Sequence, residues 1–202
     1  MTTPTVYTID DDQAVRTALR SLLRTASRAT EEYDSGRLFL DAADNDRPGC
    51  ILADIRMPGM GGLELQQALN KRHSLRPIIF MSAQADVALA VKAMKAGAAD
   101  FLEKPVDGDL LVNTVTYWLQ HALETQQAHR GRMQNLEKMR RLTHREQEIM
   151  ELLVEGKQNK QIASLLGISC RTVEAHRSKL MKKLGAKSLS EVVRIALDRA
   201  PM

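Results

Sequence analysis

The sequence predicts a doubly wound α/β domain with a five-stranded parallel sheet, followed by a smaller all-α domain. Three observations lead to this fold class. Short apolar runs alternate with helical patterns over the first 118 residues, no strand pattern occurs after residue 142, and a chain of 202 residues is long enough for two domains. Alternation of strand and helix indicates βαβ units, whereas helical patterns alone indicate a separate bundle.

Apolar runs and helical patterns define the first domain. Its strands are expected at Val6–Ile9, Thr30–Tyr33, Cys50–Ala53, Ile78–Met81 and Ala99–Leu102. Its helices are expected at Val15–Leu23, Leu63–Leu69, Val87–Met94 and Leu110–Trp118. Apolar runs without alternation are typical of parallel strands that are buried on both faces, so helices should cover both sides of the sheet.

The second domain, residues 142–202, is expected to contain four short helices. They are predicted at Arg145–Glu155, Lys160–Leu166, Arg171–Leu184 and Ser188–Leu197. Gly156, Gly167 and Gly185 follow the first three helices, as glycines commonly do at helix C-termini. Thr143 and Glu146 have the spacing of a capping box, which predicts a helix start at this point.

Charge is distributed unevenly along the chain. Residues 1–118 hold 13 Lys and Arg against 16 Asp and Glu (net −3), residues 119–141 hold 5 against 2 (+3), and residues 142–202 hold 11 against 7 (+4). Within 156–187, eight basic residues stand against the single acid Glu174. This predicts a polyanionic partner for the C-terminal domain only.

The segment between the two domains, residues 119–141, is polar, with a thin 3-4 spacing of apolar residues. A helical linker with some coiled-coil character is one interpretation, and a solvated helix or flexible tether is the simpler one. No apolar stretch approaches 18 residues and the N-terminus lacks the features of a signal peptide, so a cytoplasmic protein without a membrane partner is expected.

Composition excludes several other classes. With 44% hydrophobic and 27% charged residues, the chain is neither collagen-like nor disordered throughout. Cys50 and Cys170 are too far apart in sequence for a CxxC motif, which excludes a disulfide scaffold and argues against structural zinc. Both are expected to be reduced core thiols, although Cys170, near a helix N-terminus, could alternatively sense oxidants.

Polar residues stand at the predicted strand ends, where ligands bind in doubly wound sheets. Asp10–Asp12 follow the first strand, Asp54 the third, Ser82 the fourth, and Lys104 the fifth. Each alone is typical of a turn or helix cap, but together they place three or four carboxylates at one edge, where a cation is required. Mg²⁺ suits such oxygen ligands, and Lys104 beside it would screen an incoming phosphate so that Asp54 acts as nucleophile.

Three sequence blocks carry a family resemblance. They are residues 6–12 (VYTIDDD), 54–60 (DIRMPGM) and 93–105 (AMKAGAADFLEKP). Together they closely resemble the receiver domain of bacterial two-component response regulators, and the last block is typical of the FixJ-like subgroup. No residue type that the family requires is missing.

The resemblance assigns roles around Mg²⁺. It implies that Asp54 is the phosphoacceptor, Asp11 a direct metal ligand, and Asp10 a second acid that acts mainly through water. The main-chain carbonyl of Arg56 would be a further ligand. Gln84 and Arg56 lie where the family tunes the lifetime of the phosphoryl group. The glycines at 59, 61 and 62 are interpreted as a turn, since no GKS or GKT step follows.

The remaining receiver roles concern switching. The resemblance implies that Ser82 is the hydroxyl that moves to the phosphoryl group and that Phe101 is the switching aromatic. Lys104 would contact the phosphate and precede a cis proline, Pro105.

A helix, a short turn with Gly167 and a second helix form a helix-turn-helix pattern from residue 161 onward. On the second helix Val173, Leu180 and Leu184 share one stripe and are expected to pack inward. Glu174, Ala175, Ser178 and Lys182 share another stripe, which would be free to enter a DNA groove.

The segment 142–197 resembles LuxR-type DNA-binding domains through residues 159–163, 171–177 and 187–188. The resemblance implies contact with double-stranded DNA, by base edges or phosphates, at Lys160, Thr172, Glu174, Ala175, Arg177, Ser178, Lys182 and Lys187. It also assigns the last helix, around Val192–Ala196, to dimer contact on DNA.

The function expected from these patterns is a phosphorylation-controlled transcription regulator and not a turnover enzyme. A sensor histidine kinase would phosphorylate Asp54, the receiver would form a homodimer, and paired helix-turn-helix domains would bind promoter DNA, with RNA polymerase as a further partner. One alternative is an aspartyl-phosphate phosphatase of the haloacid dehalogenase type. That class requires a second acid two residues after the nucleophile, and this chain has Arg56 at that position. The other is a DNA-binding regulator that does not respond to phosphorylation.

Overall fold

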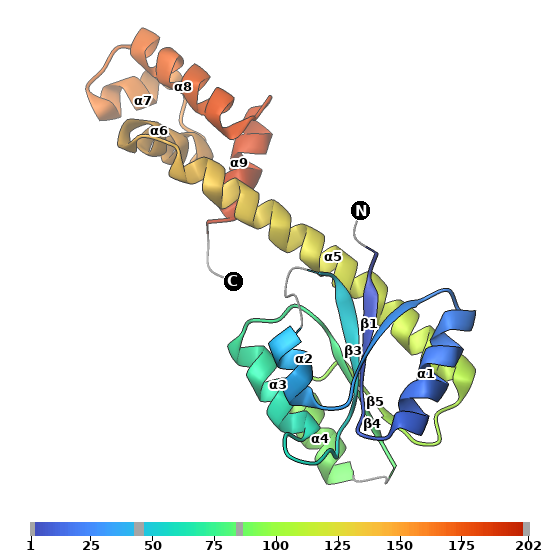
Figure 1. Ribbon diagram of the computed structural model, residues 1–202. Helices are drawn as coiled ribbons and strands as arrows, with labels where there is room; N and C mark the ends of the chain where they lie inside the picture. Colours follow the sequence, from blue (N-terminus) through green and yellow to red (C-terminus); the bar gives the residue numbers. More distant parts are fainter. Residues whose placement is uncertain (1–2, 43–46, 84–86, 200–202) are drawn as a thin grey trace. The chain divides into compact units, whose positions relative to one another are not determined.

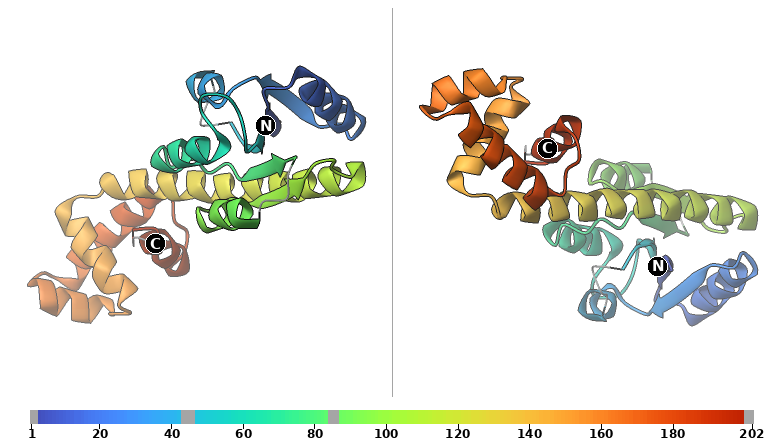
Figure 2. Two further views of the ribbon diagram at one scale, coloured as in Figure 1. Left: turned by 90° about the horizontal axis from the view of Figure 1, so that it is seen from below. Right: turned by 90° about the horizontal axis from the view of Figure 1, so that it is seen from above.

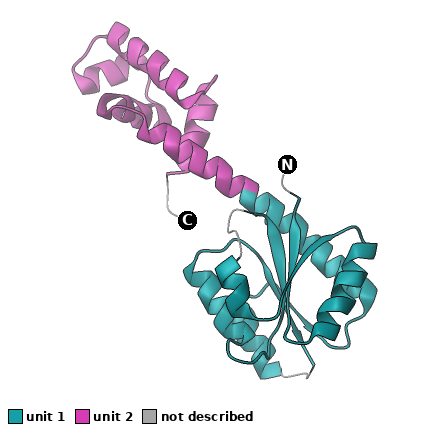
Figure 3. Cartoon of the chain, in the orientation of Figure 1, with its two compact units in different colours: residues 1–126 teal, residues 127–202 magenta. Residues whose placement is uncertain are grey.

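The structure, a computed structural model, describes residues 3–42, 47–83 and 87–199. The chain divides into two compact units, residues 1–126 and 127–202 (Figure 3). Each unit has its own buried apolar clusters, so each is described by itself.

A parallel sheet forms the centre of the first unit and confirms all five expected strands. They are β1 (Thr5–Ile9), β2 (Ala29–Tyr33), β3 (Gly49–Asp54), β4 (Ile78–Ser82) and β5 (Asp100–Glu103). The strand order is β2-β1-β3-β4-β5, and every neighbouring pair is parallel. The chain adds β2 on one side of β1 and the later strands on the other, so a topological switch point lies between β1 and β3.

Helices cover both faces of this sheet (Figure 1). They are α1 (Gln13–Thr25), α2 (Gly36–Ala42), α3 (Gly62–Lys71), α4 (Val87–Lys95) and α5 (Gly108–Arg140). Apolar residues of α1 and α5 share one buried cluster, and those of α2, α3 and α4 share the other. Helix α2 was not expected from the sequence, because seven residues are too few to show a helical period.

Successive strand residues point into different clusters. Tyr7 and Ile9 lie in the cluster beneath α2 to α4, whereas Val6 and Cys50 lie in the one beneath α1 and α5. The three central strands, β1, β3 and β4, are therefore buried on both faces, which explains their continuous apolar runs, whereas the edge strands β2 and β5 are mostly half-buried. Burial also raises the pKa of the Cys50 thiol to about 12, so this cysteine is the inert core thiol that was expected.

The second unit contains the four expected helices, coloured orange to red in Figure 2. They are α6 (His144–Val154), α7 (Asn159–Leu166), α8 (Cys170–Leu184) and α9 (Leu189–Leu197). The capping box is confirmed, since the Thr143 hydroxyl accepts from the Glu146 N–H and Glu146 accepts from the Thr143 N–H. Gly156, Gly167 and Gly185 have φ values of 80°, 65° and 67°, as predicted for glycines that end helices.

Of the expected linker, residues 119–141, all but the last residue are helical and belong to α5 together with residues 108–118. This helix is long but polar, and no helix among the described residues is both long and apolar enough to cross a membrane.

Candidate functional sites

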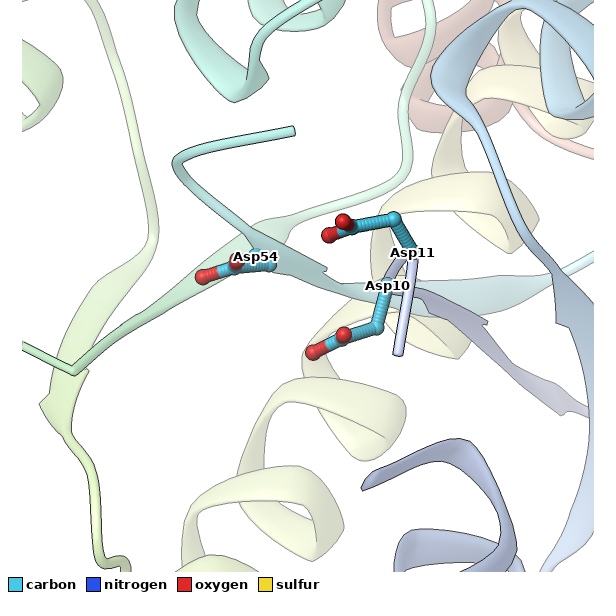
Figure 4. Close-up of side chains that lie close together, drawn as sticks. All are labelled: Asp10, Asp11 and Asp54. Carbon is cyan, nitrogen blue, oxygen red and sulfur yellow. The ribbon is translucent and has the colours of Figure 1, made fainter. Parts of the chain in front are cut away.

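The carboxyl ends of β1 and β3 bring three carboxyl groups together (Figure 4). Ile9 pairs with Ala53 in the sheet, so the next residues, Asp10 and Asp54, become neighbours. Oxygen atoms of Asp10, Asp11 and Asp54 all lie within 4.8 Å of one another. Hard oxygen donors at this spacing fit Mg²⁺, as the strand-end residues predicted.

Asp12 does not join this cluster. Its Oδ1 accepts a hydrogen bond of 2.7 Å from the Ala14 N–H, and Asp12 is the N-cap of α1. Of the three or four carboxylates expected to meet at this edge, three therefore do so, because the fourth, that of Asp12, caps a helix.

Lys104 provides positive charge at the same edge. Its Nζ lies 2.7 Å from Oδ2 of Asp10 and 3.5 Å from Oδ1 of Asp54. The Lys104 N–H donates to the Ser82 carbonyl at 2.7 Å, which anchors this residue beside β4, and the bond to Pro105 is cis. The lysine charge is thus shared between two carboxylates.

Burial raises the pKa of Asp54; Lys104 opposes this and Asp10 adds to it. A raised pKa means that the ionised carboxylate lacks compensating charge. An added divalent cation would supply this charge, so the donor set and its electrostatics both fit Mg²⁺.

The residues that the receiver resemblance assigns to switching lie on β4 and β5. Ser82 is the last residue of β4 and is buried. Phe101 pairs with Phe80 in the sheet, is half-buried and packs against the cluster beneath α2 to α4. Gln84 lies outside the described residues, whereas Arg56 lies exposed in the loop after β3.

Gly62, interpreted from sequence as part of a turn, has a different role. It is the first residue of α3, and a Cβ there would lie 2.8 Å from Ile55 Cα, 2.8 Å from Phe80 Cε1 and 2.9 Å from the Asp54 carbonyl oxygen. Glycine is needed here because α3 begins in direct contact with the end of β3. The spacing of residues in the sequence does not reveal this close contact between Gly62 and the end of β3, because the contact depends on how α3 packs against the sheet.

The second unit presents the expected helix-turn-helix. α7 ends at Gly167, and Ser169 caps α8, its Oγ accepting from the Thr172 N–H at 3.0 Å. Val173, Leu180 and Leu184 of α8 are buried as predicted.

The opposite face of α8 is exposed in the described part of the chain. Glu174, Ala175, Ser178 and Lys182 are all exposed on it. At 3.6 residues per turn these four positions form one stripe along the helix, as the sequence pattern predicted.

Other residues expected at the DNA surface differ in their surroundings. Lys160 and Lys187 are exposed. Thr172 is half-buried, with its hydroxyl 2.8 Å from that of Ser169. Arg177 is half-buried and donates to Oδ1 of Asn159 at 3.1 Å, so it joins α8 to α7.

Two further expectations are met only in part. In the segment around 192–196, Val192 and Ile195 are buried in the core of their own unit whereas Arg194 is exposed, so the dimer contact stays a prediction. Cys170 is half-buried at the start of α8, where it packs against the edge of a buried cluster and does not lie inside it.

Comparison with protein families divides the chain as its geometry does. Residues 6–116 match the response regulator receiver domain, and residues 140–196 match the luxR family of bacterial regulatory proteins. The chain belongs to the response-regulator family, in the group that combines a receiver with a LuxR-type domain.

Several relatives match this chain over most of both lengths. The chain is 45% identical to the transcriptional regulatory protein FixJ of Azorhizobium caulinodans, over 95% of this chain and 91% of that protein. It is 39% identical to the transcriptional regulatory protein TdiR of Thauera aromatica, over 96% of this chain and 85% of that one. Among solved structures, the response regulator StyR matches with a TM-score of 0.87 and 40% identity, covering 96% of this chain and 98% of StyR.

Proposed function

We propose that this response regulator is phosphorylated on Asp54 by a sensor histidine kinase and that phosphorylation promotes dimerisation and sequence-specific DNA binding. The observation that carries the proposal is the cluster of Asp10, Asp11 and Asp54 with Lys104 beside it. Aspartyl phosphorylation requires a carboxylate nucleophile whose negative surroundings are neutralised, and these residues meet that requirement.

The chemistry at Asp54 is transfer of a phosphoryl group. An oxygen of Asp54 attacks phosphorus of the kinase phosphohistidine, the P–N bond breaks, and the imidazole leaves. Mg²⁺, held by Asp10, Asp11, Asp54 and the Arg56 main-chain carbonyl, supplies charge neutralisation when bound. Lys104 then contacts the transferred group, from a position already 3.5 Å from Asp54.

The response to phosphorylation begins at Ser82 and Phe101. The Ser82 hydroxyl turns to the phosphoryl oxygens, and Phe101 moves inward and alters the surface of α4, β5 and the start of α5, which dimerises. Raising a dimer-competent state from 1% to 99% needs about 5.5 kcal/mol of differential stabilisation. We therefore expect partial dimerisation at micromolar concentration.

The exposed stripe of α8 reads DNA in this proposal. Glu174, Ala175 and Ser178 contact base edges. Thr172, Arg177 and the lysines that flank this stripe contact DNA phosphates. The phosphate-contacting lysines are Lys160, Lys182 and Lys187. Dimerisation adds a second half-site, and RNA polymerase responds at the promoter.

Mass spectrometry tests the assignment of Asp54. Incubation with acetyl phosphate and Mg²⁺ should give a single phosphoryl adduct that is lost in EDTA and absent in Asp54→Asn. The matched control is Asp12→Asn, which retains an N-cap side chain outside the cluster and should keep the adduct. An undiminished adduct on Asp54→Asn would refute the assignment.

Two measurements separate the rivals. Steady turnover of small phosphate esters would support the phosphatase. DNA affinity that is the same with and without acetyl phosphate would support a regulator that does not respond to phosphorylation.

A further inference from the structure

Arg16, in the first turn of α1, reaches back to the loop that carries the acidic cluster. Its Nη1 donates a hydrogen bond of 2.5 Å to the main-chain carbonyl of Asp10, and its side chain is half-buried. The Arg16 N–H also donates to the Asp12 carbonyl at 3.1 Å, and Asp12 caps α1 through Ala14. The loop is therefore tied to the start of α1 by main-chain and side-chain contacts.

The other polar groups of Asp10 are also paired. Its N–H donates to the Tyr33 carbonyl at 3.2 Å, Oδ1 accepts from the Asp12 N–H at 2.9 Å, and Oδ2 accepts from Lys104 at 2.7 Å. Arg16 is the partner of the one remaining group, the carbonyl oxygen. The two side chains that bind Asp10 are those of Lys104 and Arg16. Lys104 takes part in the proposed phosphoryl transfer, whereas Arg16 has no such role.

The Asp10 carbonyl and the Asp11 nitrogen belong to one planar peptide group. A strong, charge-assisted hydrogen bond on that carbonyl therefore fixes the plane, and with it the direction in which the Asp11 side chain leaves the main chain. Asp11 needs such an external constraint. It is exposed, and in the described part of the chain its carboxylate has no hydrogen bond of its own.

We propose that Arg16 is a positioning residue that orients Asp11 for a divalent cation by holding the peptide group between Asp10 and Asp11. This rests on the proposed function, since it concerns the cation site beside Asp54. In this role Arg16 would act through the main chain, by its hydrogen bond to the Asp10 carbonyl, and not as a metal ligand.

Removal of Arg16 should change the Mg²⁺ affinity in opposite directions depending on whether its charge or its positioning role dominates, and this makes the proposal testable. Arg16 is a cation near a cation site, so its removal would strengthen Mg²⁺ binding if its charge alone mattered. Removal of a group that orients a metal ligand weakens affinity instead, by roughly 10-fold or more. The sign of the change in the Mg²⁺ dissociation constant distinguishes the two.

Calorimetric titration of the full chain with MgCl₂ provides the test. Arg16→Ala should bind Mg²⁺ about 10-fold more weakly. Arg16→Lys, which keeps a donor, should recover part of this loss. The matched control is Arg20→Ala, one turn further along α1, where Arg20 pairs with Glu32 on the surface at 3.2 Å; its affinity should not change.

A second titration with CaCl₂ separates positioning from general damage. Mg²⁺ demands near-ideal octahedral geometry, whereas Ca²⁺ accepts irregular sites, so Arg16→Ala should lose less affinity for Ca²⁺ than for Mg²⁺. A merely structural defect would weaken both ions alike.

Unchanged or tighter Mg²⁺ binding by Arg16→Ala, or equal losses for both ions, would overturn the positioning role. Should Arg16→Ala fail to fold, Arg16→Lys decides: a lower ratio of Mg²⁺ to Ca²⁺ affinity than in the unmutated protein supports the role, and an unchanged ratio refutes it. Failure of the proposed function is distinguishable, because the unmutated protein itself would then bind no Mg²⁺ and accept no phosphoryl group.

Discussion

Substitution of Gly62 by alanine should destabilise the receiver unit, whereas the same substitution at Gly61 should not. Both glycines have negative or helical φ values that alanine adopts freely, so backbone strain does not distinguish them. Loss of unfolded-state freedom favours alanine by about 0.4 to 1 kcal/mol at either position. The difference must come from the space that each Cβ enters.

That space differs sharply. A Cβ at Gly61 meets only the Ile55 carbonyl oxygen, at 3.7 Å, which is ordinary contact. A Cβ at Gly62 meets the main chain of Ile55 and of Asp54 and the Phe80 ring, all at less than 3.0 Å. Overpacking of a well-packed core costs about 1 to 3 kcal/mol, and two of these three neighbours are backbone that cannot move aside cheaply. The net effect should be destabilisation by about 1 to 2 kcal/mol for Gly62→Ala and a slight gain for Gly61→Ala.

Urea denaturation followed by tryptophan fluorescence measures this in the full chain. Trp118 is the only tryptophan and packs against the cluster beneath α1 and α5, so its emission reports on the first unit. With a urea dependence of about 1 to 3 kcal/mol per molar, the unfolding midpoint of Gly62→Ala should fall by about 0.5 to 1 M. Equal midpoints for Gly62→Ala and Gly61→Ala would refute the inferred contact between α3 and the end of β3.

Three further predictions concern the second unit and the assembly. Burial would raise the pKa of Glu146, but hydrogen bonds from Lys183 and Thr143 hold this pKa below its usual value. These hydrogen bonds therefore stabilise the fold fully at pH values above the pKa that Glu146 has in the unfolded chain. The stabilisation is lost as the pH falls through the pKa that Glu146 has in the folded protein. Lys183→Ala should cost about 1 to 3 kcal/mol at neutral pH by circular dichroism, with the difference vanishing in acid; a difference independent of pH would contradict this. Glu174→Ala should change the preferred base, at a cost of about 1 to 3 kcal/mol in binding to the original DNA site. Lys182→Ala should lower the affinity for all duplexes alike and reduce by about one the slope of log affinity against log salt concentration. The reverse pattern would mean that α8 docks on DNA in a different orientation. Sedimentation of the phosphorylated protein should show partial dimerisation, and an unchanged mass would leave release of an inhibitory contact between the units as the better account.

Local patterns in the sequence were sufficient for most of the fold. Apolar runs predicted β1, β3 and β4, and weaker strand patterns predicted β2 and β5. The capping box at Thr143 and the glycines after α6, α7 and α8 predicted helix ends, because these signals depend on residues close together in the chain. The one missed helix, α2, is too short to carry a period.

The candidate site was accessible to sequence reasoning for a topological reason. The strands of a parallel sheet end at the same edge, so residues that follow them collect there. Asp10 and Asp54 follow the adjacent strands β1 and β3, and the long side chain of Lys104, which follows β5, reaches both. The family resemblance added roles for Ser82 and Phe101, which position alone does not provide.

Short-range patterns along the chain were enough to predict the acidic edge of the sheet, the exposed stripe on α8 and every element except α2. Three contacts between elements became known only from the packed structure: Arg16 with the Asp10 carbonyl, Arg177 with Asn159, and Gly62 with the end of β3. Periodicity and helix caps depend on residues that are neighbours in the chain. A hydrogen bond or close approach between elements depends instead on how whole surfaces pack, to within a fraction of an ångström.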